Sequence, residues 1–130
     1  MTPKARRLTI NPAAMSKFSG NLSSHELAVL PLVVDILRSR TGRGHEVSSQ
    51  MIISAVRRIG YHISGIEVRH IVNHIRVNAV IPCLASNGNG YHVALTREDM
   101  DDCISSLRGR VESIKEVIAA LTAQRDVRFS

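Results

Sequence analysis

The stretch that decides the fold is YHISGIEVRHIVNHIRVNAVIP, residues 61–82. Ser64 and Glu67 have the spacing of a capping box, in which each side chain binds the other residue's backbone N–H where a helix begins. Apolar residues then recur with a helical period, and Pro82 lies just beyond the last of them. The stretch therefore predicts a helix over residues 65–79.

This predicted helix has two chemically different faces. On a helical wheel, its apolar residues gather on one side and are predicted to lie in the core: Val68, Ile71, Val72 and Ile75. The other side, with its flanks, carries mainly hydrogen-bonding groups: Ile66, Glu67, Arg69, His70, Asn73, His74, Arg76 and Val77. This second face has three interpretations: a surface that reads nucleic acid, a metal site, or a solvated helix face.

The metal interpretation depends on His70 and His74, whose spacing of four residues would let both bind one zinc ion. The segment HIVNH lacks the glutamate of the zinc-protease pattern, and His62 is the only close candidate for a third ligand. Paired carboxylates, a nucleophile motif and a phosphate-cradling glycine loop are also missing. We therefore predict no metal site, no cofactor and no enzymatic activity.

Helix-start patterns also precede this stretch. Ser23 and Glu26 form another capping box, and the apolar stripe that follows comprises Leu27, Leu30, Val34 and Leu37. Pro31 interrupts this stripe, so the first helix either kinks or begins there. The short segment HEVS is predicted to be extended. A second helix then begins at Ser48 or Ser49 and ends at Gly60, with an apolar stripe of Ile52, Ala55, Val56 and Ile59.

After the central helix, the segment VIPCLASNGNGYHVAL predicts a β-hairpin. Its apolar flanks, residues 80–84 and 91–95, surround SNGNG, whose Asn-Gly pairs suit turn positions with positive φ. Thr96 and Asp99 then predict the start of a helix that runs to about residue 125. The fold class is mainly α with a small β-hairpin.

The order helix, short strand, helix, tight turn, helix and hairpin resembles a winged helix-turn-helix domain over residues 23–95. The ending GNGYHVA, followed by a long helix containing SLRGRVESI, is similar to winged-helix proteins of phages and other mobile elements. The resemblance implies that residues 65–79 form the recognition helix, which lies in the DNA major groove. Asn73 and Arg69 would pair with base edges, Ile66 would meet a thymine methyl, and His70 would lie beside them.

The charge distribution also favours a polyanionic partner. The chain carries a net charge of +6, with four basic and no acidic residues in 1–20 and seven basic against four acidic residues in 21–95. The predicted phosphate contacts are Arg57, Arg58, His74, Arg76, Asn87, Asn89, Lys4, Arg6 and Arg7. The last three belong to residues 1–22, predicted to be a basic flexible arm that follows DNA or, equally, an ordinary tail.

The last part of the chain, residues 96–130, is predicted to be a dimerisation helix with a short tail. Its apolar residues follow an unbroken heptad pattern: Met100, Ile104, Leu107, Val111, Ile114, Ile118 and Leu121. A helix of about 45 Å exceeds the width of the preceding domain, so this stripe is predicted to pair two copies through residues 96–125. The alternative is a helix folded back on its own domain. The polarity stays open, although Asp101 facing Lys115 weakly favours an antiparallel pair.

The sequence thus predicts a dimer that binds double-stranded DNA sequence-specifically, as a transcriptional regulator or replication accessory protein of a mobile element. A winged-helix adaptor that binds proteins instead of DNA is the main alternative, and RNA binding is a third possibility. Cys83 and Cys103 are unpatterned and predict reduced thiols in a cytoplasmic, nucleoid-associated protein. The longest apolar run, residues 27–34, is too short to cross a membrane, so no membrane partner is expected.

Overall fold

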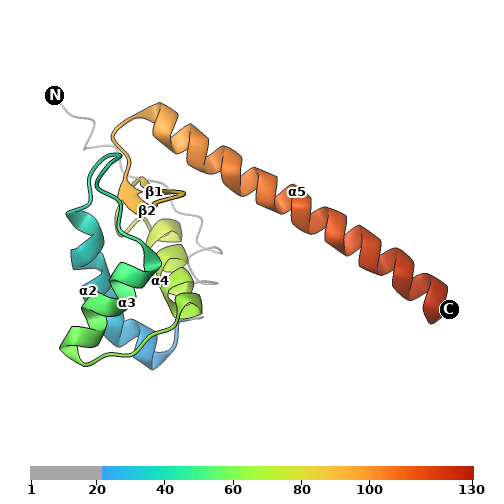
Figure 1. Ribbon diagram of the computed structural model, residues 1–130, viewed down its shortest axis with the longest axis horizontal. Helices are drawn as coiled ribbons and strands as arrows, with labels where there is room; N and C mark the ends of the chain where they lie inside the picture. The colour runs from blue at the N-terminus through green and yellow to red at the C-terminus, as the bar shows by residue number, and fades with distance from the viewer. Residues whose placement is uncertain (1–21) are drawn as a thin grey trace. The chain divides into compact units, whose positions relative to one another are not determined.

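The computed structural model describes residues 22–130, which divide into two compact units between Leu95 and Thr96. The first unit contains α2 (Ser24–Arg38), α3 (Ser49–Ile59), α4 (Gly65–Val77), β1 (Leu84–Asn87) and β2 (Gly90–Val93) (Figure 1). The second contains α5 (Arg97–Arg128). The predicted fold class is therefore confirmed. The three helices and antiparallel hairpin of the first unit are compatible with a winged-helix arrangement.

Each of these four helices begins at a hydroxyl side chain that accepts a backbone N–H from the first turn: Ser23, Ser48, Ser64 and Thr96. The capping boxes completed by Glu26 and Glu67 are both present, as their spacing predicts. Such a cap satisfies a backbone donor that would otherwise lack an intrahelical partner. Local sequence therefore sets where these helices begin.

The buried face of α2 differs from the predicted one. The helix runs through Pro31 without ending, so it does not begin there. Leu27, predicted to be inside, is 47% exposed, whereas Val29 and Val33 are fully buried. The reason is that α2 packs against α3, α4 and β2 at once, which centres its buried face on those two valines. In α3, the predicted inward residue Ile59 is exposed as well.

The core of the first unit is built from aliphatic side chains. The predicted inward face of α4 is confirmed, since its four apolar residues are all buried: Val68, Ile71, Val72 and Ile75. Each such side chain contributes about 1.5–3 kcal/mol when fully removed from water. Leu22, which the sequence assigns to the arm, belongs to this core. The rest of the predicted arm, including Lys4, Arg6 and Arg7, lies outside the described residues.

Helix α4 ends two residues earlier than predicted because of backbone bonds at its C-terminus. Ala79 adopts a left-handed conformation with φ of 52°, and its N–H donates to the carbonyl of Arg76. The N–H of Val80 donates to the carbonyl of Ile75 at 2.9 Å. These two bonds form a Schellman motif, which usually places glycine at the left-handed position. Cys83 is left-handed too, with φ of 61°, so β1 begins at Leu84 instead of Val80.

The hairpin has a two-residue turn, Gly88–Asn89, between the paired residues Asn87 and Gly90. Of these four residues, only Gly90 has a positive φ, 136°, so the Asn89-Gly90 step supplies a predicted positive-φ position and the Asn87-Gly88 step does not. The predicted extended segment joins the sheet at Val47, which exchanges two backbone hydrogen bonds of 2.9 Å with Tyr91. A Cβ atom on Gly90 would collide with the Val47 carbonyl, so this close approach requires glycine.

Helix α5 is 32 residues long and forms a unit by itself. Six of its stripe residues are at least one-third exposed: Ile104, Leu107, Val111, Ile114, Ile118 and Leu121. The seventh, Met100, is partly buried. No helix within residues 22–130 is long and apolar enough to cross a membrane.

Candidate nucleic-acid interface

A tight turn joins α3 to α4, and two arginines at the end of α3 immediately precede this turn in the sequence. Gly60 ends α3 with a φ of 109°, and its N–H donates to the Arg57 carbonyl at 2.9 Å. Four residues later, Ser64 caps α4. Arg57 and Arg58 occupy the last turn of α3, and both are exposed. Their cationic groups are therefore accessible to an anion such as a DNA phosphate.

The four predicted reading residues lie on one outward face of α4. Ile66 is 61% exposed, Arg69 is exposed, and Asn73 is partly exposed. The side chain of His70 is 53% exposed. The core residues of α4 lie on the opposite side of the same helix, so the packing of the domain turns this face outward. The structure thus brings the four side chains together, while their contacts with DNA remain a prediction.

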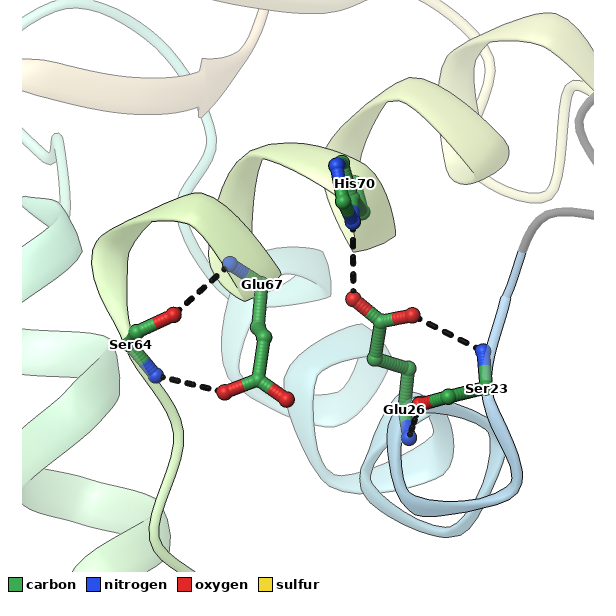
Figure 2. A network of polar contacts seen from close by, with 5 residues as sticks. All are labelled: Ser23, Glu26, Ser64, Glu67 and His70. Atoms are coloured by element: carbon green, nitrogen blue, oxygen red, sulfur yellow. Dashed lines mark hydrogen bonds and ion pairs between the residues drawn. The ribbon is translucent and has the colours of Figure 1, made fainter.

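His70 has a partner that the sequence did not reveal. Its Nδ1 lies 2.9 Å from Oε2 of Glu26, a residue of α2 that is only 4% exposed (Figure 2). The other carboxylate oxygen, Oε1, accepts the Ser23 N–H at 2.8 Å. Burial opposes ionisation of Glu26, but the hydrogen bonds from Ser23 and His70 outweigh it and hold the pKa of this carboxyl below its usual value. Capping-box spacing predicted the contact between Ser23 and Glu26 but gave no sign of the contact between Glu26 and His70.

The remaining histidines in this region make separate contacts. His74, a predicted phosphate contact, has its Nδ1 at 3.3 Å from the Asn78 amide nitrogen, which also donates to the His74 carbonyl at 2.9 Å. The carbonyl of His62 lies 2.7 Å from the ring of His25. Among residues 22–130, no group of three histidine, cysteine or acidic residues is placed to hold a metal ion.

Arg76, predicted to contact phosphate, is bound to the hairpin instead of extending freely from α4. Its Nε donates to the Leu84 carbonyl at 2.8 Å, and its Nη2 donates to the Ser86 hydroxyl at 3.1 Å. The guanidinium also lies 5.8 Å from the ring centroid of Tyr91, within the range of a cation–π contact. Arg76 therefore fixes the hairpin against α4, and its contact with phosphate stays a prediction.

The two hairpin asparagines lie beside the start of α3. Asn87 donates from its side-chain amide to Oε2 of Glu46 at 2.7 Å, which with the Gly44 N–H lowers the pKa of Glu46 to about 2. Asn89 is exposed at the turn, and its N–H donates to Oδ1 of Asn87. Both asparagines line a polar cleft of about 320 Å³ with Ser48, Ser49 and Ser86. The cleft joins the hairpin turn to the first residues of α3.

Comparison with protein-family models, curated proteins and solved structures gave no match for this chain. Its function must therefore be inferred from the residues themselves. The features that bear on it are the outward face of α4, the exposed arginines at the end of α3, and the apolar stripe of α5.

Proposed function

We propose that this protein binds double-stranded DNA sequence-specifically as a homodimer, with α4 in the major groove. The observation that carries the proposal is the outward face of α4, where Ile66, Arg69 and His70 are exposed and Asn73 is partly exposed beside them. Arginine pairs with guanine and asparagine with adenine through two hydrogen bonds, and isoleucine can contact a thymine methyl. These three chemistries on one exposed helix face are suited to reading base edges.

The phosphate contacts proposed beside this face come from α3 and the hairpin. Arg57 and Arg58 are exposed at the end of α3, and residues 21–95 carry an excess of three positive charges. At the other end of α3, Ser48 and Ser49 lie with Asn89 along the polar cleft. Backbone N–H groups at a helix start bind phosphate oxygens well, since these donors have no intrahelical partner. Such contacts would orient α4 without reading sequence.

The second copy in the proposed dimer pairs through α5. Its heptad stripe is exposed in the single chain from Ile104 to Leu121, a length of about five helical turns. Water-exposed apolar residues repeating every seven positions are the pattern that paired helices bury. Two joined copies would present two α4 helices and so bind two half-sites of one DNA target.

The biological role we propose is that of a transcriptional regulator or replication accessory protein of a mobile element, without catalytic activity. One observation favours the alternative role of a protein-binding adaptor. A groove of about 580 Å³ between α2 and α3 is lined by Ile36 and the exposed Met51, with Arg40 and Arg58 also in its wall. An amphipathic peptide with acidic groups would suit that groove better than DNA bases would.

Selection from random double-stranded DNA distinguishes these two roles. If the proposal is right, the purified 130-residue chain enriches a common motif, and binding weakens steeply with salt because counterions are released from the phosphates. A matched variant carrying Arg69→Ala and Asn73→Ala keeps the basic residues of α3 and should enrich no motif. Failure of the wild-type protein to bind any duplex at low salt would refute the proposed function.

A further inference from the structure

The contact between Glu26 and His70 fixes which nitrogen of His70 carries hydrogen. Both oxygens of the Glu26 carboxylate are occupied, Oε1 by the Ser23 N–H and Oε2 by His70 Nδ1 (Figure 2). An ionised carboxylate can only accept hydrogen bonds. The hydrogen between Oε2 and Nδ1 therefore belongs to the histidine. In the neutral imidazole the other nitrogen, Nε2, must then carry a lone pair and act as an acceptor.

The acceptor nitrogen belongs to a half-exposed side chain of the proposed reading face. In Figure 2, the second nitrogen of His70 points away from Glu26, and 53% of the side chain is exposed. In the major groove, adenine and cytosine each present an exocyclic amino donor, whereas guanine presents two acceptors. A lone pair on Nε2 can accept a hydrogen bond from an amino group. It cannot form a hydrogen bond with guanine, because both guanine groups are also acceptors and no hydrogen lies between the lone pairs.

We propose that Glu26 is a specificity-determining residue, because by holding hydrogen on Nδ1 it makes Nε2 of His70 an acceptor that selects a base with an amino group over guanine. This inference rests on the proposed function, since it assumes that α4 reads DNA. Glu26 itself touches no base and acts as a positioning residue. It also caps α2, so one buried carboxylate serves both the start of α2 and the chemistry of α4.

The substitution Glu26→Gln should reverse the tautomer while keeping the helix cap. The side-chain oxygen of the introduced glutamine is needed to accept the Ser23 N–H, which leaves its amide NH₂ facing His70. An amide NH₂ can only donate, so Nδ1 would become the acceptor and hydrogen would move to Nε2. Long-range ¹H–¹⁵N NMR of the full chain at pH 8 distinguishes the two tautomers and also the protonated ring. We expect Nδ1–H in the wild type and Nε2–H in the variant.

Two residues of α4 provide internal controls. His74 has its Nδ1 next to a donor, the Asn78 amide, so it should be the Nε2–H tautomer in both proteins. Glu67 forms the same capping box with Ser64, but its contacts within residues 22–130 do not include a histidine ring. The variant Glu67→Gln thus makes the same chemical change in a matching box. It should leave the tautomer of His70 unchanged.

Selection from random duplexes at the same pH tests the effect on sequence preference. At one base-pair position, the wild type and Glu67→Gln should prefer an amino donor, and Glu26→Gln should shift toward guanine by roughly two- to tenfold, as expected for one hydrogen bond. His70→Ala should lose the preference at that position. Adding Glu26→Gln to His70→Ala should change nothing further, since Glu26 is proposed to act through His70.

Each outcome of these measurements supports or overturns the inference. A wild-type His70 with hydrogen on Nε2 overturns it without reference to DNA. A reversed tautomer with an unchanged motif overturns the role in specificity. If Glu26→Gln fails to fold, the wild-type tautomer and the motif of His70→Ala still decide, because His70→Ala leaves the cap intact. If the wild type binds no duplex, the proposed function and this specificity both fall, and the NMR result shows separately whether the Glu26–His70 contact was right.

Discussion

Replacing both Leu107 and Val111 of α5 with aspartate should separate the proposed dimer into monomers. In the single chain these side chains are 39% and 50% exposed, so pairing can remove about half of each from water. Full burial of such a side chain is worth about 1.5–3 kcal/mol, so burying the exposed half is worth about 1 kcal/mol. A dimer buries four of these side chains, two from each copy. The loss of about 4 kcal/mol corresponds to roughly a thousandfold weaker dimerisation, before counting the cost of burying aspartate.

Sedimentation velocity over a range of concentrations measures this effect directly. The wild type should sediment as a dimer at micromolar concentration, and the double variant as a monomer of 14.3 kDa. The control is Ser106→Asp with Ser113→Asp, which adds the same charge to exposed positions of α5 outside the apolar stripe. DNA affinity should fall in the first variant alone, because a monomer holds only one half-site.

Three results would refute this reasoning. A wild type that is monomeric at micromolar concentration would exclude pairing through α5. Equal effects of the two double variants would show that added charge matters and the stripe does not. Loss of the helical circular dichroism signal of the whole chain in Leu107→Asp with Val111→Asp would show that the stripe stabilises its own protomer.

Individual contacts elsewhere in the chain lead to four more expected outcomes. Arg69→Ala and Asn73→Ala should each cost about 1–3 kcal/mol on the selected site and relax its sequence, and equal losses on random DNA would contradict base reading. Neutralising Arg57 or Arg58 with glutamine should weaken binding to all duplexes alike and flatten the plot of log K against log salt by about 1; an unchanged slope would exclude a phosphate contact. The pKa of Glu26 is lower in the folded protein than its unfolded value of about 4.5. The stability that this lowering contributes is fully present above pH 4.5 and is lost as pH falls through the folded pKa. Urea titrations should therefore show the stability advantage over Glu26→Gln shrinking below pH 4.5. Ala79→Gly should raise the free energy of unfolding by about 1 kcal/mol, because glycine tolerates the left-handed conformation, and a decrease would show that the methyl group of Ala79 matters more.

Much of the fold could be predicted from short-range patterns in the sequence. The capping boxes at Ser23 and Ser64 involve residues three apart, so the starts of α2 and α4 follow from local chemistry. The inward face of α4 follows from helical periodicity, and the stripe of α5 follows from the heptad repeat. The outward face of α4, which is the proposed reading face, is the complement of its buried face, so it was predictable too. In each case the deciding interaction or spacing lies within about two helical turns.

Tertiary structure decided where these elements meet. Leu27 fits a helical stripe but is exposed, because the buried face of α2 depends on which neighbours it packs against. The sequence predicts Arg76 as a phosphate contact, and it gives no sign that the Arg76 guanidinium donates hydrogen bonds to Leu84 and Ser86 of the hairpin. Glu26 and His70 lie 44 residues apart, and nothing periodic links them in the sequence. Contacts of this kind form only when the core brings distant segments together. The local spacing of a residue therefore predicts its position on its own helix, whereas the packing of the domain determines which partner its side chain binds.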